Sequence, residues 1–96
     1  MLEKDIEKKL VRWAKEHGGV AYKFISPGNS GVPDRIVIFP NRPPIFVELK
    51  NEDGQLTKLQ ETQITRLRSL GQEAVVVKGA IGLMKFCEDV EEIYGI

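Results

Sequence analysis

The chain has 96 residues, of which 42% are apolar and 29% are charged, and its formal net charge is zero. This length supports one modest hydrophobic core, so we expect a single domain over residues 1–96. The composition is typical of a soluble globular protein and excludes a low-complexity chain. No apolar stretch approaches the roughly 18 residues of a membrane span, and MLEKDIEKK lacks the apolar core of a signal peptide. These features predict a cytoplasmic protein with no membrane partner.

The chain has one cysteine and one histidine, which limits metal and redox chemistry. Cys87 has no partner for an internal disulfide, and with His17 alone there is no Cys/His cluster for zinc. We expect Cys87 to fill the core as a small apolar side chain and His17 to lie at a helix C-terminus.

The charges are unevenly distributed along the chain. Residues 88–96 hold four acids and no base, so residues 1–87 carry 14 bases against 10 acids. This distribution permits a nucleic-acid partner but does not require one, because an acidic segment is also typical of a solvated helix face.

The N-terminal third of the chain predicts a helix, a strand and a loop. Apolar residues at helical spacing indicate an amphipathic helix over residues 2–17, ended by Gly18-Gly19. Val20–Ile25 has the composition of a strand. The segment Ser26–Pro33, SPGNSGVP, is predicted to be a loop because it concentrates glycine, proline, asparagine and serine.

Two short runs rich in β-branched residues follow, and they predict a hairpin. Arg35–Phe39 and Ile45–Leu49 are joined by a five-residue, proline-rich connection. Apolar side chains alternate onto both faces of each run, as in strands covered on two sides. If Phe39 pairs with Ile45, then Asp34 lies across from Lys50 and diagonal to Glu48.

The rest of the chain predicts a crossover. Thr57-Lys58-Leu59-Gln60 has the form of a capping box, and it opens a helix that runs to about Leu70 and ends at Gly71. Ala74–Val77 reads as a buried strand, and Ile81 to about Ile93 as a final helix. The predicted order α-β-β-β-α-β-α places one parallel pair beside the hairpin, in a mixed sheet of about four strands flanked by helices.

Three charged residues are predicted to meet at one end of the hairpin. Glu48 and Lys50 project from the same strand face, and Asp34 lies on the diagonal at roughly 7 to 8 Å. Two carboxylates in an apolar setting repel each other and lose hydration, which a divalent cation offsets. Asp34, Glu48 and the Leu49 carbonyl supply the oxygens that Mg²⁺ or Mn²⁺ prefers. For the Glu-Leu-Lys tripeptide alone, an exposed salt bridge is the competing interpretation.

These residues resemble a known nuclease signature. Pro33-Asp34, a hairpin, and then Glu48-Leu49-Lys50 match the PD-(D/E)XK pattern. The segments KFISPGNSGVPDRIVIFP, FVELKNEDGQLTKLQ and RLRSLGQEAVVV are similar to the VRR-NUC (virus-type replication-repair nuclease) domain of small stand-alone phage proteins, over nearly the entire chain. The resemblance implies a restriction-endonuclease-like α/β core and a Mg²⁺- or Mn²⁺-dependent endodeoxyribonuclease.

The resemblance also implies roles for particular residues. Asp34 and Glu48 would hold the ion, and Lys50 would orient the attacking water or stabilise charge on the scissile phosphate. Gln60 matches a glutamine that follows the signature, although the capping box alone would explain it. A helix-one glutamate assists the metal site in related resolvases; we favour Glu7 over Glu3, with a surface charge as the alternative.

The loop before Asp34 is a candidate DNA contact. Its backbone amides, including that of Gly28, together with Ser26 and the nearby Lys23 and Arg35, are predicted to touch phosphates. A plain connecting turn is the competing account.

The expected reaction is hydrolysis of a DNA phosphodiester by metal-activated water, and the family likeness implies 5′-phosphate and 3′-hydroxyl products. Small relatives resemble junction resolvases that work as twofold dimers, which suggests a homodimer acting on branched DNA such as Holliday junctions during phage replication, repair or recombination in the host cytoplasm. A helicase or another replication-repair protein is a candidate partner. The alternatives are a flap-type nuclease, a non-catalytic nucleic-acid-binding module on the same fold, and a purely structural interaction protein.

Overall fold

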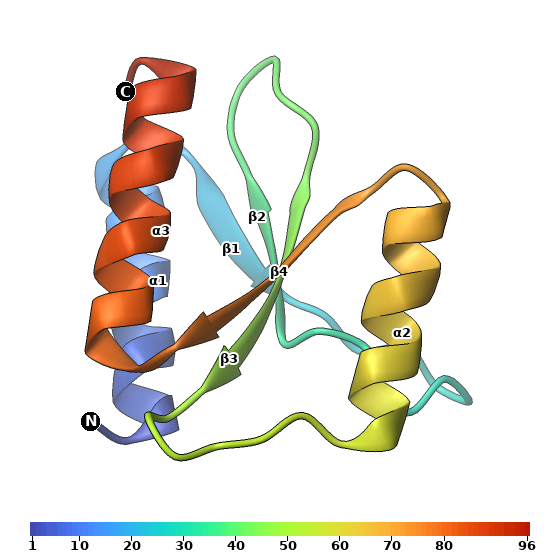
Figure 1. The fold of residues 1–96 in the computed structure, drawn as a ribbon. Coiled ribbons are helices and arrows are strands. Elements are labelled where there is room, and N and C mark those ends of the chain that lie inside the picture. Colours follow the sequence, from blue (N-terminus) through green and yellow to red (C-terminus); the bar gives the residue numbers. More distant parts are fainter.

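The computed structural model describes residues 1–96 as three helices and four strands (Figure 1). In chain order the elements are α1 (Glu3–Glu16), β1 (Val20–Lys23), β2 (Arg35–Ile38), β3 (Ile45–Lys50), α2 (Lys58–Ser69), β4 (Glu73–Lys78) and α3 (Gly79–Tyr94). The predicted order α-β-β-β-α-β-α is confirmed. The first strand ends at Lys23 rather than Ile25, and the last helix begins at Gly79 rather than Ile81.

The four strands form one mixed sheet in the order β1-β2-β3-β4. β1 and β2 are antiparallel, as are β2 and β3, whereas β3 and β4 are parallel. Helix α2 carries the chain from the end of β3 back to the start of β4, which is the connection that a parallel pair requires. The predicted mixed sheet with one parallel pair is therefore confirmed.

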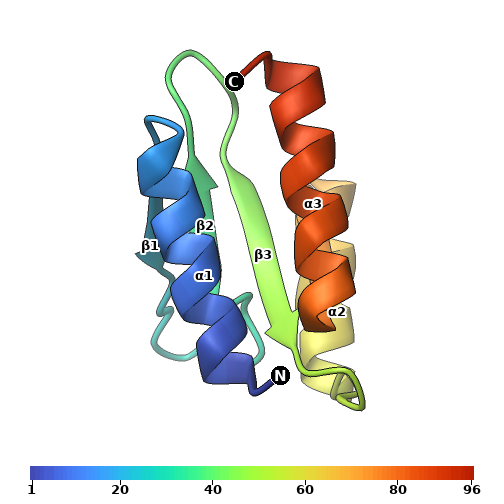
Figure 2. The ribbon, with the colours of Figure 1, turned by 90° about the vertical axis from the view of Figure 1, so that its left-hand side faces the viewer.

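Helices cover both faces of the sheet. α1 and α3 lie side by side on one face, and α2 lies alone on the other (Figures 1 and 2). The main core fills the space between the sheet and the α1/α3 layer, and it includes Ile6, Leu10, Val37, Val47, Leu49 and Val77. None of the three helices combines the length and the apolar character that a membrane crossing needs.

Coverage on two sides holds for β3 but not for β2. Glu48 and Leu49, which point to opposite faces of β3, are both buried. On the α2 face of the neighbouring strands, however, Tyr22 is 61% exposed and Ile38 is 36% exposed. The expectation of full cover was wrong for β2 because α2 lies against β4, at the other side of the sheet, and leaves the β1–β2 half of this face open.

The predicted hairpin register was wrong by two residues. Val37 pairs with Ile45, whereas the prediction placed Phe39 opposite Ile45. The connection is longer than five residues because Phe39 already belongs to a turn, in which its carbonyl accepts a hydrogen bond from the Arg42 N–H at 3.3 Å. Pro43 and Pro44 have no N–H to donate to a ladder, so pairing begins only at Ile45.

The register shift has a consequence for the charged residues. An even shift keeps every side chain on its predicted face. It nevertheless moves Asp34, the residue before β2, from a position across from Lys50 to one directly across from Glu48, since Arg35 pairs with Val47. Directly opposed residues lie closer than diagonal ones, so the two carboxylates are nearer than the sequence indicated.

The lone cysteine and histidine occupy the positions expected of them. Cys87 packs against the core from α3, and burial together with Glu91 and Glu88 raises the pKa of its thiol to about 12. His17 follows the last residue of α1, and its Nδ1 lies 2.9 Å from the carbonyl oxygen of Trp13. Cys87 therefore contributes to packing, and His17 to the C-terminal end of α1.

Candidate active site

Asp34 is held between two strands where the long loop enters β2. Its Oδ2 accepts a hydrogen bond from the Leu49 N–H of β3 at 2.8 Å, and its backbone carbonyl accepts one from the Phe24 N–H at 2.9 Å. Pro33, immediately before it, is fully buried. The carboxylate is therefore fixed at the start of β2, with one of its oxygens already paired.

Glu48 lies in the middle of the sheet and is only 1% exposed. Its Oε2 accepts a hydrogen bond from Gln60 Nε2 at 3.1 Å and lies 3.8 Å from Lys50 Nζ. Its other oxygen, Oε1, is buried and has no hydrogen-bond partner. A buried acceptor without a partner is costly, so a further group is expected at this atom.

Lys50 ends β3 on the same face as Glu48, and its side chain is 14% exposed. The loop after it folds back over its stem, because a Cβ on Gly54 would lie 3.2 Å from the Lys50 Cβ and Cδ. The ammonium group is thereby kept near Glu48 rather than free in solvent.

Gln60 both caps α2 and contacts Glu48, two roles that the sequence alone left as alternatives. Its side-chain Oε1 accepts from the Thr57 N–H while its backbone N–H donates to Thr57 Oγ1, so the predicted capping box of α2 is confirmed. The same amide group uses its Nε2 to donate to Glu48. The first turn of α2 thus positions the amide against Glu48.

The surroundings of Glu48 disfavour the ionised form of its carboxyl group. Burial, followed by the negative charge of Asp34, raises the pKa of Glu48 to about 8, and the Lys50 ammonium only partly opposes this shift. A hydrogen bond with the Asp34 side chain, which forms when one of the two carboxyl groups is protonated, raises this pKa further. Lys50 alone therefore does not compensate the pair of carboxylates.

The chemistry of these donors fits a divalent cation. The carboxyl group of Glu48, with its unpartnered Oε1, lies next to that of Asp34, and a cation between the two side chains would satisfy both. The Leu49 carbonyl leaves β3 on the same side as the Leu49 N–H, which points to Asp34. The structure contains no cluster of three or more His, Cys, Asp or Glu side chains placed to hold a metal ion, so backbone and water would supply the remaining ligands.

The structure separates the two glutamates considered on α1. Glu7 accepts a hydrogen bond from Arg35 Nε at 2.8 Å, and Arg35 Nη1 donates to the Ala21 carbonyl at 3.0 Å. Glu3 instead is close enough to Asp34 and Lys50 to interact with them: partial burial and then Asp34 raise the pKa of Glu3, and Lys50 lowers it. The charge of Glu3 thus interacts with Asp34 and Lys50, whereas the favoured Glu7 is paired with Arg35; neither joins Asp34 and Glu48 in a cluster that could hold a metal ion.

The four predicted DNA contacts lie in different surroundings. Arg35 is tied to Glu7 beside α1, on the opposite face of the sheet from Glu48. Lys23 is exposed at the end of β1. Ser26 Oγ accepts a hydrogen bond from Asn29 Nδ2 at 2.9 Å across a turn. Gly28 lies in that turn, and a Cβ at this position would meet nothing within 4 Å. Asp34, Glu48, Lys50 and Gln60 thus lie together in the structure. The four predicted DNA contacts lie at the edge of this group or away from it.

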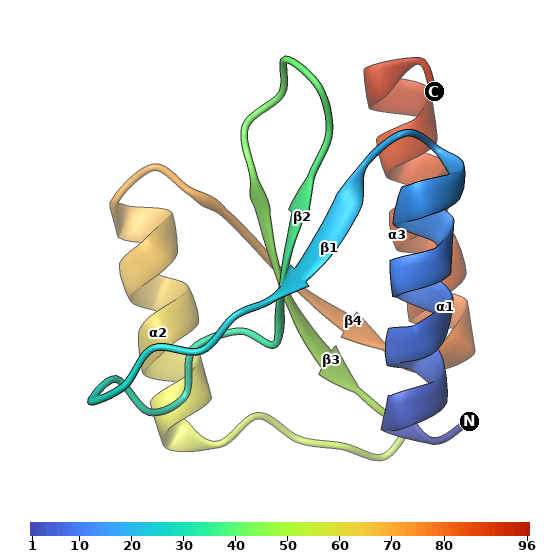
Figure 3. The ribbon, with the colours of Figure 1, turned by 180° about the vertical axis from the view of Figure 1, so that it is seen from behind.

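The loop between β1 and β2 is attached to α2, which was not predicted from the sequence. The loop between β1 and β2 extends across to α2 (Figure 3), where Gln63 Nε2 donates to the Ser30 carbonyl. Gly31 has a φ of +89°, and a Cβ there would lie 2.6 Å from the Leu59 carbonyl. The glycine in GVPD is the signal that the backbone makes a close approach at this position.

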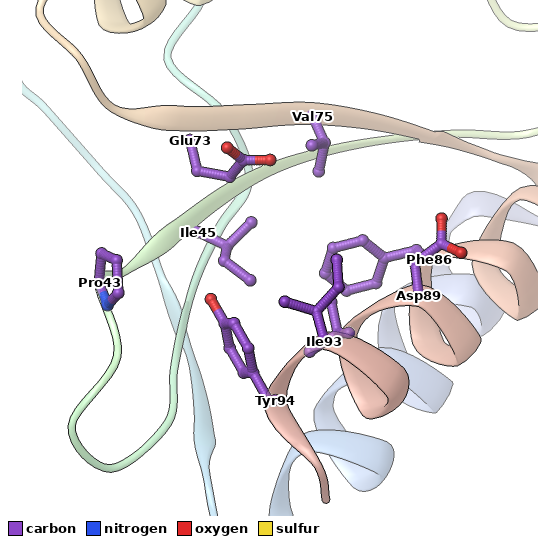
Figure 4. Close-up of a pocket in the computed structure, with 9 residues that line it drawn as sticks. Pro43, Ile45, Glu73, Val75, Phe86, Asp89, Ile93 and Tyr94 are labelled. Atoms are coloured by element: carbon purple, nitrogen blue, oxygen red, sulfur yellow. The ribbon is translucent and has the colours of Figure 1, made fainter.

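A groove of about 320 Å³ lies elsewhere, between α3 and the start of strands β3 and β4 (Figure 4). Ile45, Val75, Phe86 and Ile93 give it mainly apolar walls. It is formed at the opposite ends of β3 and β4 from Lys50, so it is separate from the carboxylate pair.

Comparisons with known proteins agree with this geometry. The model of the VRR-NUC domain family matches residues 2–81. "Putative nuclease p44" of Acyrthosiphon pisum secondary endosymbiont phage 1 is 47% identical over 75 residues, which cover 78% of this chain and 81% of that protein. A solved structure described as a VRR_NUC domain superposes with a TM-score of 0.79 at 29% identity over 96% of both chains. A second, a VRR_NUC domain protein, has a TM-score of 0.71 at 20% identity over 97% of this chain and 90% of its own, and so bears on the fold alone.

The fold and the matched region together define a nuclease-type α/β domain. The chain belongs to the VRR-NUC family, the virus-type replication-repair nucleases, as its motifs indicated.

Proposed function

We propose that this chain is a metal-dependent DNA endonuclease whose active site is formed by Asp34, Glu48, Lys50 and Gln60. The observation that carries the proposal is the buried Glu48 Oε1, which has no hydrogen-bond partner and lies beside a second carboxylate. A packing role does not account for this arrangement, because an apolar residue would avoid the cost. Mg²⁺ or Mn²⁺ is the cofactor that suits such oxygen donors.

Each residue has a distinct task in this reaction. Asp34 and Glu48, with the Leu49 carbonyl, hold the ion, which when bound supplies Lewis acidity toward the scissile phosphate and lowers the pKa of a water molecule. Lys50 places a positive charge where negative charge develops on the phosphate during attack. Gln60 keeps Glu48 Oε2 in place. The oxygen of the attacking water forms a bond to phosphorus and this water gives up a proton to solvent. The P–O3′ bond breaks and O3′ takes up a proton, which leaves 5′-phosphate and 3′-hydroxyl ends.

Glu3 is the additional acid that we assign to this site, since its carboxyl group interacts with Asp34 and Lys50. Glu7 acts on it indirectly: its ion pair with Arg35 fixes α1 against the residue that follows Asp34. Lys23, Ser26 and the Gly28 amide remain proposed phosphate contacts at the edge of the site.

The proposed substrate is branched DNA of the Holliday-junction type in phage replication, repair or recombination, and the proposed assembly is a homodimer. The open β1–β2 half of the sheet, with Tyr22 and Ile38 exposed, supplies apolar surface that a second copy would bury. A twofold dimer would present two active sites to the two symmetric strands of a junction. A strict monomer by light scattering at micromolar concentration would contradict the junction assignment while leaving the nuclease itself intact.

The test is cleavage of junction, flap and linear DNA with Mn²⁺ by wild type, Asp34→Asn and Lys50→Ala. Asp34→Asn is the sharper variant because an amide oxygen still accepts from the Leu49 N–H while the charge is lost. We expect metal-dependent cutting by wild type and a loss of at least about 100-fold in both variants. Equal trace cutting by all three proteins would indicate contamination, and would favour a non-catalytic nucleic-acid-binding module on the same fold.

A further inference from the structure

The outer face of α1 carries a continuous basic stripe, defined here as Lys4, Lys8, Arg12 and Lys15. At about 100° per residue these four positions fall within roughly 80° of the helix circumference. All four side chains are exposed. They lie opposite the face that α1 buries against the sheet, which is made by Ile6, Leu10, Trp13 and Ala14.

The stripe has no structural partner within the protein. None of its four cations forms an ion pair; the ion pairs of the structure involve Met1, His17, Arg35 and Lys50 instead. Lys4 and Lys8, and again Lys8 and Arg12, are like charges four residues apart, a spacing that weakens a helix. No acid falls within the arc of the stripe; Asp5 and Glu16 border it, about 20° and 40° beyond Arg12.

The stripe begins at the end of the sheet that carries the candidate active site, on the outer side of the helix layer that covers the other face (Figure 2). α1 starts where β3 ends (Figures 2 and 3), and Glu3, next to Lys4, interacts with Asp34 and Lys50. From Lys4 to Lys15 the helix rises about 16 Å. A DNA strand places roughly five phosphates along that length of duplex axis. Four of the 14 acids of the chain lie in the last turns of α3. These turns lie beside the C-terminal end of α1, where Glu91 Oε2 accepts a hydrogen bond from Trp13 Nε1 at 2.8 Å and lies 3.9 Å from His17 Nε2. The Lys4 end of the stripe, nearer the candidate active site, is the end farther from these acids.

We propose that this stripe binds the phosphate backbone of a DNA arm that flanks the cleaved bond. The inference rests on the proposed function, since it is the nearby nuclease site that selects DNA among polyanions. The contacts are electrostatic and do not depend on the DNA sequence. They position the scissile phosphate at Asp34 and Glu48 and take no part in the chemistry.

The test is the salt dependence of binding to a labelled four-way junction, measured by anisotropy in EDTA so that no cutting occurs. The stripe variant is Lys8→Gln/Arg12→Gln. The matched control is Lys9→Gln/Lys85→Gln, which removes the same charge from exposed positions outside the stripe. The circular dichroism spectrum and melting temperature of each variant check that it is folded.

We expect the stripe variant to bind at least about tenfold more weakly at low salt, and its slope of log K against log[salt] to fall by about 2, near 0.9 for each lost phosphate contact. The control should stay within about twofold with an unchanged slope. Equal loss in both variants, or no loss in either, would overturn the inference, as would a wild type that binds no junction DNA. If the stripe variant has the smaller slope but the wild type never cuts DNA with Mn²⁺, the stripe is a DNA-binding surface and the proposed nuclease activity is wrong.

Discussion

At the scale of single residues, the site depends on a few atoms that have no apolar substitute. Glu48 is buried with one oxygen paired to Gln60 and the other unpaired. Asp34 is fixed by the Leu49 N–H. Such an arrangement is tolerated in a small domain only where function requires it, because each unsatisfied buried group lowers the free energy of unfolding.

Two variants separate the contact of Gln60 with Glu48 from its role in capping α2. Thr57→Ala removes the cap but keeps the amide, whereas Gln60→Ala removes both the reciprocal cap and the contact with Glu48. We expect Thr57→Ala to lower the free energy of unfolding by about 1 kcal/mol. Gln60→Ala should lower it by about 2 to 3 kcal/mol, because the buried Glu48 Oε2 also loses its donor. Cleavage should fall about 10- to 100-fold in Gln60→Ala and remain within a few-fold in Thr57→Ala. Urea denaturation and a Mn²⁺ cleavage assay measure the two effects; equal cleavage by both variants would reduce Gln60 to a cap.

Much of the site was predictable at this scale, and the exceptions have physical causes. Period-2 alternation fixed the face of Glu48 and Lys50, so their shared side followed from the sequence. Which α1 glutamate adjoins Asp34 did not follow, because Glu3 and Glu7 differ by about one turn and only the packing of α1 on β2, through Arg35, decides between them.

At the scale of elements, the connections determine the geometry more than the strands do. The strands and helices were predicted close to their true positions because their apolar patterns are strong. The hairpin register was not, because a turn at Phe39 and two prolines delay pairing until Ile45, and strand composition does not reveal where pairing begins. This error concealed the direct opposition of Asp34 and Glu48.

The long loop before β2 is held in place by its contact with α2. Gly31→Ala puts a Cβ 2.6 Å from the Leu59 carbonyl at a φ of +89°, whereas Gly28→Ala has a similar φ of +82° with nothing within 4 Å. We expect Gly28→Ala to lower the free energy of unfolding by about 1 kcal/mol, from backbone strain alone. Gly31→Ala should cost about 3 kcal/mol or more, since a steric clash is added. Thermal or urea unfolding compares the two, and equal losses would mean that α2 yields at this contact.

At the scale of the whole molecule, the topology brings together residues that are far apart in the chain. The antiparallel hairpin places Asp34 across from Glu48, and the first turn of α2, in the crossover from β3 to β4, places Gln60 against Glu48. The main core lies on the other face of the sheet, between it and the α1/α3 layer, so the carboxylate pair does not interrupt it. A chain of 96 residues thereby separates the apolar layer that stabilises it from the polar layer assigned to catalysis.

Thermal unfolding with and without Mn²⁺ shows whether Asp34 and Glu48 together bind a divalent cation. Ligand binding to the folded state at a hundredfold excess over Kd adds about 2.7 kcal/mol to the free energy of unfolding. In a domain of this size that corresponds to a rise in Tm of roughly 10 °C or more. We expect this rise in wild type and its absence in Asp34→Asn, each compared with its own value in EDTA. No rise in wild type, or an equal rise in both proteins, would contradict the account.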